Sequence, residues 1–223
     1  MKRRRLIIGD YDTAENGWTL AAWNFSAARH KETLVDKPGG DGAWDLSTVL
    51  TDGIPRYQPR TLTATLERSD GNRESREYEI QEIVNMLDGL RWNIYLPDDV
   101  DRYIVGRVSV ARKYSDLAHA AVTVTATCEP WKYNQYDTVQ EIQATSAAQA
   151  HHVYNGGRRA VVPTLEVEGN PIAAVSLVYG ESSRVLVAGV YQVPDLLLTP
   201  GVHEITVSGT GLLRISYREA VLE

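Results

Sequence analysis

The fold is decided by an alternating stretch that runs from Ala121 to Cys128 and reads AVTVTATC. Small or apolar side chains alternate there with threonines, and successive side chains of a β-strand point to opposite faces. The same period of two recurs in residues 61–67, TLTATLE, and in residues 103–110, YIVGRVSV. β-Branched residues are frequent in all three stretches, which favours strands. The first part of the chain is therefore predicted to be largely β-sheet.

One segment between Arg73 and Leu90 has helical spacing instead. Its apolar residues recur three or four positions apart, at Ile80, Ile83, Val84, Leu87 and Leu90. Residues 70–72, Asp-Gly-Asn, offer capping chemistry before it, and Gly89 is placed to close it. We expect one helix near residues 73–90, lying on a sheet so that its apolar stripe is buried.

The composition changes near residues 129–133, EPWKY. Residues 1–134 contain 18 of the 23 Lys and Arg and 20 of the 29 Asp and Glu, which leaves 5 and 9 for residues 135–223. The later part reads as short strands separated by Gly and Pro, at residues 160–162, 165–167, 174–178, 184–187, 202–207 and 212–217. Strands about 8–12 residues apart with turns between them are typical of a β-sandwich. We therefore expect two mainly β domains, residues 1–134 and 135–223.

The properties of the whole chain limit its partners. A formal net charge of −6 argues against general binding to nucleic acid. The basic run Lys2–Arg5 lies at a terminus, where such charges are usually solvated. No signal-peptide core follows it, and no apolar run approaches the roughly 20 residues that cross a bilayer. The single cysteine, Cys128, excludes an internal disulfide and is expected in the core. We expect cytoplasmic synthesis, no membrane insertion and no specific nucleic-acid binding.

Sequence patterns for catalysis or metal binding are missing. There is no G-x-S-x-G nucleophile elbow and no G-x-x-x-x-G-K-[ST] phosphate loop. His151 and His152 would point to opposite faces of a strand, so they cannot easily chelate one metal. Asp98, Asp99 and Asp101 are better explained as a turn than as a calcium loop. We expect no enzyme activity, no cofactor and no metal.

A series of short motifs carries the interpretation further. The series begins with residues 35–46, VDKPGGDGAWDL, which contain a Pro-Gly-x-Asp-Gly loop and an Asp-Leu pair. It continues with Gly53, Tyr57, Arg60, the Gly106-Arg107 step, residues 129–133, residues 153–157 (VYNGG), residues 162–165 (VPTL) and residues 209–219 (GTGLLRISYRE). In this order the chain resembles the siphophage distal tail protein (Dit) family over nearly its whole length.

The resemblance implies a structural virion protein at the distal end of a phage tail, made in the host bacterial cytoplasm. The first domain, a β-sandwich or barrel-like unit with one helix, would form a hexameric ring, and the second would be a galectin-like β-sandwich. The protein would act as a distal tail hub in the tail tip, joining the tail tube to the baseplate or host-adsorption device. Its expected partners are the tail tube protein, a tail-associated hub protein and the tape measure protein, with receptor-binding proteins as a further candidate.

A closed ring requires one patch of each subunit to meet a different patch of the next. The loop at residues 36–46 is exposed by its glycines, which adopt positive φ easily, yet it carries Trp44. Aromatic side chains are enriched at subunit interfaces. The candidate subunit-interface residues are Pro38, Gly39, Gly40, Asp41, Gly42 and Trp44.

Two alternatives stay open. A carbohydrate-binding module acting in host-surface attachment would need an exposed aromatic platform, for which residues 135–223 offer Tyr154, Tyr179, Tyr191 and Tyr217 but no Trp. A hydrolase acting on cell wall or capsule would need two converging carboxylates or a metal. The low acid count of residues 135–223 argues against the second alternative.

Overall fold

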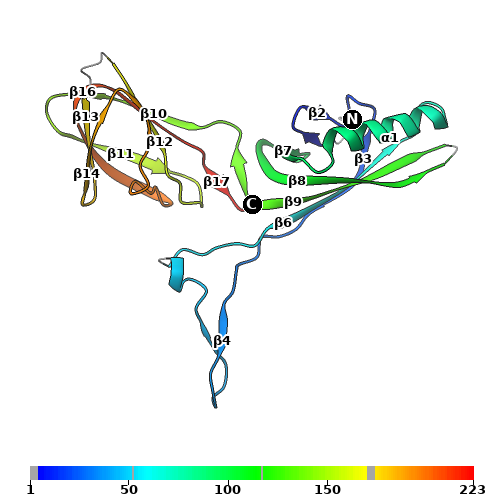
Figure 1. Ribbon diagram of the computed structural model, residues 1–223, viewed down its shortest axis with the longest axis horizontal. Coiled ribbons are helices and arrows are strands. Elements are labelled where there is room, and N and C mark those ends of the chain that lie inside the picture. Colours follow the sequence, from blue (N-terminus) through cyan, green and yellow to red (C-terminus); the bar gives the residue numbers. More distant parts are fainter. Residues whose placement is uncertain (1–4, 52, 117, 170–173) are drawn as a thin grey trace. The chain divides into compact units, whose positions relative to one another are not determined.

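The computed structural model describes residues 5–51, 53–116, 118–169 and 174–223. The basic residues Lys2, Arg3 and Arg4 lie outside the described residues. The chain forms two compact units, Met1–Lys132 and Tyr133–Glu223 (Figure 1). The predicted fold class is confirmed, because the elements are mainly β-strands with one α-helix.

Seven strands that begin in the first unit lie in one sheet, in the order β2-β1-β7-β8-β9-β6-β3. Their bounds are β1 Ile7–Ile8, β2 Tyr11–Asp12, β3 Thr19–Phe25, β6 Arg60–Arg68, β7 Arg91–Leu96, β8 Asp99–Ser115 and β9 Ala120–Asn134. The three alternating stretches lie in β6, β8 and β9, as predicted. Leu62 and Val124 are fully buried, and Cys128 lies in the same core. The threonines between them lie on the other face, where Thr63 is paired with Thr125.

The helix of the first unit is α1, Arg73–Leu87. The side chain of Asn72 caps it by accepting a hydrogen bond from the backbone N–H of Ser75 at 2.8 Å. Gly89 follows with φ 75°, which closes the helix as expected. One predicted member of the buried stripe is wrong. Leu90 lies beyond the helix and is 50% exposed, because the chain has already turned at Gly89.

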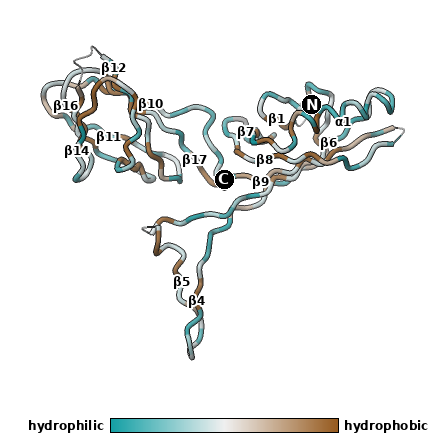
Figure 2. Tube along the Cα trace, viewed as in Figure 1, coloured by the Kyte–Doolittle hydropathy of each residue, from teal (hydrophilic) through white to brown (hydrophobic). Residues whose placement is uncertain are grey.

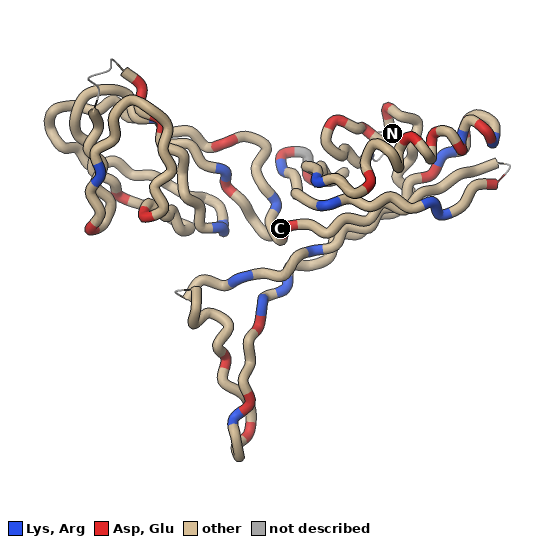
Figure 3. Tube along the Cα trace, in the orientation of Figure 1, with Lys and Arg blue, Asp and Glu red and all other residues tan. Residues whose placement is uncertain are grey.

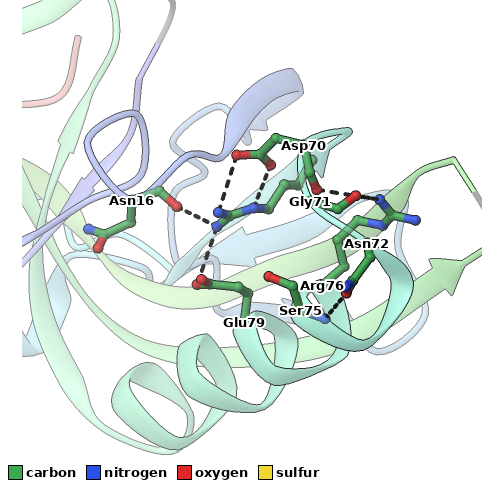
Figure 4. Close-up of polar contacts among 8 residues, drawn as sticks. Asn16, Asp70, Gly71, Asn72, Ser75, Arg76 and Glu79 are labelled. Atoms are coloured by element: carbon green, nitrogen blue, oxygen red, sulfur yellow. Dashed lines mark hydrogen bonds and ion pairs between the residues drawn. The ribbon is translucent and has the colours of Figure 1, made fainter.

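Two arginines fix the start of α1 (Figure 4). Arg68 forms ion pairs with Asp70 at 2.6 Å and with Glu79 of the helix at 3.2 Å. Arg76 is 1% exposed and donates to the backbone carbonyl of Gly71 at 2.6 Å. Hydrogen bonds to backbone carbonyls compensate for burying a charged group. The start of the helix is therefore held both to β6 and to the loop before it.

Two sheets form the second unit and share one long strand, β16 (Gly201–Tyr217). One sheet pairs β16 with β10 (Thr138–Ala144) and β12 (Thr164–Glu168), and β12 also pairs with β15 (Gly189–Gln192). The other pairs β16 with β11 (Gln149–Asn155) and β13 (Ala174–Tyr179), and β13 also pairs with β14 (Ser182–Val187). Side chains from both sheets, including fully buried Leu165 and Val175, form one core. The arrangement is a β-sandwich.

Two strand predictions in this unit need correction. Residues 202–207 and 212–217 are one continuous strand, because Gly209 and Gly211, with φ of 123° and 121°, carry β16 from one sheet to the other. Residues 160–162 are not a strand. They contribute only an isolated bridge between Val161 and Leu198.

Candidate subunit-interface arm

The predicted interface loop lies at the tip of a two-stranded arm made by β4 (Leu34–Asp36) and β5 (Ala43–Asp45). The tip is a turn in which the N–H of Gly40 donates to the carbonyl of Lys37 at 3.2 Å. Gly39 and Gly42 have φ of 71° and 76°, so both positions favour glycine. All of the predicted candidates, Pro38, Gly39, Gly40, Asp41, Gly42 and Trp44, lie on the arm, and all are exposed.

The arm leaves the sheet where β3 ends and β6 begins (Figure 1). None of the described residues from 26 to 59 is buried. Its two strands pair with each other and with no third strand that the structure describes. An isolated two-stranded ribbon is only marginally stable in water. The arm therefore has the properties of a segment that is completed by another surface.

Apolar side chains follow one face of the arm. Val35 lies directly opposite Trp44, and opposed residues of a strand pair share a face. Leu46, two residues after Trp44, continues the row, and its N–H donates to the carbonyl of Thr33 at 2.8 Å. Trp44 is 52% exposed and Leu50, in the 3-10 turn η1 (Val49–Thr51), is 95% exposed. The exposed large apolar residues of the arm, together called the apolar stripe below, are Leu34, Val35, Trp44, Leu46, Val49 and Leu50; of these, Leu34 is opposite Asp45 and lies on the other face of the strand pair. Figure 2 shows hydrophobic colouring along the tube of this part of the chain.

The root of the arm is fixed by aromatic and cationic contacts. His30 and Tyr57 form an antiparallel bridge between the two segments that make up the root of the arm, and their ring centroids are 4.7 Å apart. Tyr57 packs edge-on against Trp131 at 5.3 Å. Arg60 is 2% exposed, donates to the carbonyl of Ser26 at 2.6 Å, and lies 3.8 Å from the ring centroid of Phe25. The root is therefore ordered by the sheet, although the arm beyond it is exposed.

Charge is unevenly distributed along the arm (Figure 3). The exposed residues Arg29, Lys31 and Arg56 make the root basic. The distal half carries Asp36, Asp41 and Asp45 against Lys37. Hydrogen bonds from the side chain and backbone of Ser47 lower the pKa of Asp45 below its usual value. The arm thus combines an apolar stripe with charged groups of both signs, a mixture that suits a specific protein contact.

Sequence reasoning found the tip of the arm but missed its most exposed apolar part. Glycines marked the tip, because an exposed turn needs them. The turn at residues 46–50 gave no comparable signal, since Leu46, Val49 and Leu50 look like core residues when the pairing partner of a segment is unknown. A run of large apolar residues lying within a stretch of turn signals was the only available indication.

The described part of the chain contains no group of three or more His, Cys, Asp or Glu residues placed to hold a metal ion. None of its helices has the length and apolar character needed to cross a membrane.

The chain thus combines a sheet-and-helix unit that carries an exposed apolar arm with a β-sandwich unit. No protein-family model and no curated protein sequence matches the chain. Its structure is similar to the crystal structure of SPP1 Dit (gp 19.1), described as a paradigm of the hub adsorption apparatus in phages that infect Gram-positive bacteria. The TM-score is 0.69 at 14% sequence identity, and the match covers 96% of this chain and 98% of that chain. The predicted resemblance to Dit is therefore confirmed at the level of the fold.

Proposed function

We propose that this chain is a structural protein of a phage tail tip, a distal hub that joins the tail tube to the host-adsorption device. The observation that carries the proposal is the likeness of fold to SPP1 Dit, which extends over both units and nearly the full length of both chains. Fold alone does not fix function. The exposed apolar arm supplies independent support, because it suits a protein that works only in an assembly.

In this proposal the first unit closes into a ring and the second offers a docking surface. Six copies are expected from the resemblance to distal tail proteins. The partners would be the tail tube protein, a tail-associated hub protein and the tape measure protein, with receptor-binding proteins at the baseplate. The protein would be located in the virion, at the distal end of the tail, and would have a structural rather than an enzymatic role.

The mass of the purified chain in solution tests the proposal. Light scattering should give about six times the 24.8 kDa of one chain, and negative-stain images should show a ring with a central hole. A chain that stays monomeric at high concentration, and also in the presence of the tail tube protein as a template, would contradict the proposal.

Trp44 provides a first mutational test of the arm. Trp44→Ala should weaken ring assembly by roughly 10-fold or more, because truncating a buried interface tryptophan commonly costs about 2 kcal/mol. The fold of the chain should not change, since Trp44 is half exposed within one chain. Sedimentation across a dilution series measures the effect. Unchanged assembly would remove this part of the arm from the interface.

One observation favours carbohydrate binding as a second candidate function. Tyr154 is 62% exposed on β11, and the neighbouring outward pair on the same face is His152 opposite Glu204 of β16. An aromatic face beside hydrogen-bonding side chains is the arrangement that a sugar ring needs. Glycan-array binding by the full chain, lost in Tyr154→Ala, would support this candidate, and an array without binding would contradict it.

A further inference from the structure

The first unit exposes two separate sets of large apolar side chains. Ten such residues are exposed among those that the structure describes, and six of them form the stripe of the arm. Three others, Tyr78, Met86 and Leu90, lie on α1 or immediately after it. The tenth, Tyr114, donates its hydroxyl proton to Glu67 at 3.2 Å. The unit therefore presents one apolar set on a projecting arm and one on the outer side of a helix.

The outer side of α1 carries a regular row. Glu74, Tyr78, Glu82 and Met86 are spaced four residues apart, so they lie along one side of the helix. Tyr78 is 67% exposed and Met86 is 47% exposed, whereas the exposed Leu90 lies beyond the helix, after the chain has turned at Gly89. The opposite side of α1 is the one that packs on the sheet, through Ile80, Ile83 and Leu87. Nothing in the described part of the first unit covers this outer row.

The arm and the α1 row are complementary in two respects. Both carry large apolar side chains, and burying such side chains against each other stabilises an association. The exposed cations Arg29, Lys31 and Arg56 at the arm root are opposite in sign to Glu74 and Glu82 of the row, whereas Asp36, Asp41 and Asp45 of the distal half have the same sign as the row. A ring also requires two different patches on each subunit that fit one another. These two patches meet that requirement within a single unit.

We propose that the arm of one copy docks on the outer row of α1 in the next copy, with its apolar stripe against Tyr78 and Met86. This inference rests on the proposed ring, and it names the surface that receives the arm. A small residue in place of Met86 or Tyr78 would then impair assembly as much as a change in the arm itself.

Disulfide cross-linking between copies tests the docking. Cysteines are introduced one at a time in the arm, at Trp44, Leu46 or Leu50, and are combined with Tyr78→Cys or Met86→Cys, giving six double variants. The native thiol should not interfere, because Cys128 is 1% exposed and burial raises its pKa to about 11. Matched controls pair each arm cysteine with Thr63→Cys, an exposed position on the sheet face away from α1.

We expect mild oxidation of assembled rings to give a ladder of reducible species at multiples of 24.8 kDa for at least one arm-to-helix pair. The Thr63 controls should remain single chains. Rings that form normally but cross-link to Thr63, or at none of the six arm-to-helix pairs, would overturn the docking and leave the ring proposal standing. A chain that remains monomeric by light scattering contradicts the ring itself, and the two failures are thereby distinguished.

Discussion

Replacing Gly209 by alanine should destabilise the second unit by about 3 kcal/mol or more. Gly209 has φ of 123°, a conformation that other residues adopt only with strain. A Cβ there would lie 2.1 Å from the backbone carbonyl oxygen of Ala174. A backbone atom cannot rotate away as a side chain can. Because Val175 is paired with Gly209, β13 would have to separate from β16, the strand common to both sheets.

Gly201→Ala is the matched control, because Gly201 has φ of 120° but has no atom within 4 Å of the position of a Cβ. It should show the strain alone, about 1–3 kcal/mol. All five tryptophans lie in the first unit, so their fluorescence reports on that unit, whereas far-UV circular dichroism reports on both. Gly209→Ala should shift the denaturant midpoint seen by circular dichroism and not the one seen by fluorescence. If Gly209→Ala and Gly201→Ala lower the stability equally, then the contact between the added Cβ and the carbonyl oxygen of Ala174 does not contribute to the loss.

Strands and the helix of the first unit were predictable where the apolar residues of a segment follow either the strand or the helix period and the segment has recognisable ends. In β6 and β9 the alternation of Leu62 or Val124 with threonine matches a sheet that is buried on one face only. In α1 the stripe and the Asn72 cap agree with each other. Leu90 was assigned to the buried stripe because its spacing continues that stripe. Spacing alone could not show that the backbone turns at Gly89.

The long strand β16 could not be predicted from periodicity. Glycines within a strand pattern usually indicate a turn or a bulge, so Gly209 and Gly211 suggested two strands. In the structure they allow one strand to pass between the two sheets, with β13 close against Gly209. Whether a glycine ends a strand or bends it depends on the neighbouring strand, and that strand is distant in sequence.

The candidate site was predictable in position and not in extent. The glycines at residues 39–42 located the exposed tip, and Trp44 indicated that the tip is more than a solvated turn. Only the turn signals around them indicated that Leu46, Val49 and Leu50 lie outside any core. Burial is decided by contacts with distant segments, and in the described residues these three side chains have no covering segment within the chain.

Replacing Leu46, Val49 and Leu50 together by serine should abolish ring assembly at micromolar concentration. Burying these side chains at an interface would contribute about 3–5 kcal/mol, so their loss should raise the dissociation constant of each subunit contact roughly 100- to 4000-fold. The stability of the single chain should change by no more than about 0.5 kcal/mol, because the substitutions fall at exposed positions. Light scattering measures assembly, and denaturation measures stability.

The control triple variant replaces Val185, Val187 and Val190 by serine. These residues are 70%, 54% and 65% exposed in the second unit, so the change in exposed apolar character is comparable. If general stickiness causes the association, both triple variants should lose it equally. If the arm is a specific contact, only the arm variant should become monomeric while its unfolding midpoint stays unchanged. If the arm variant assembles like the parent chain, then Leu46, Val49 and Leu50 do not belong to the interface between subunits.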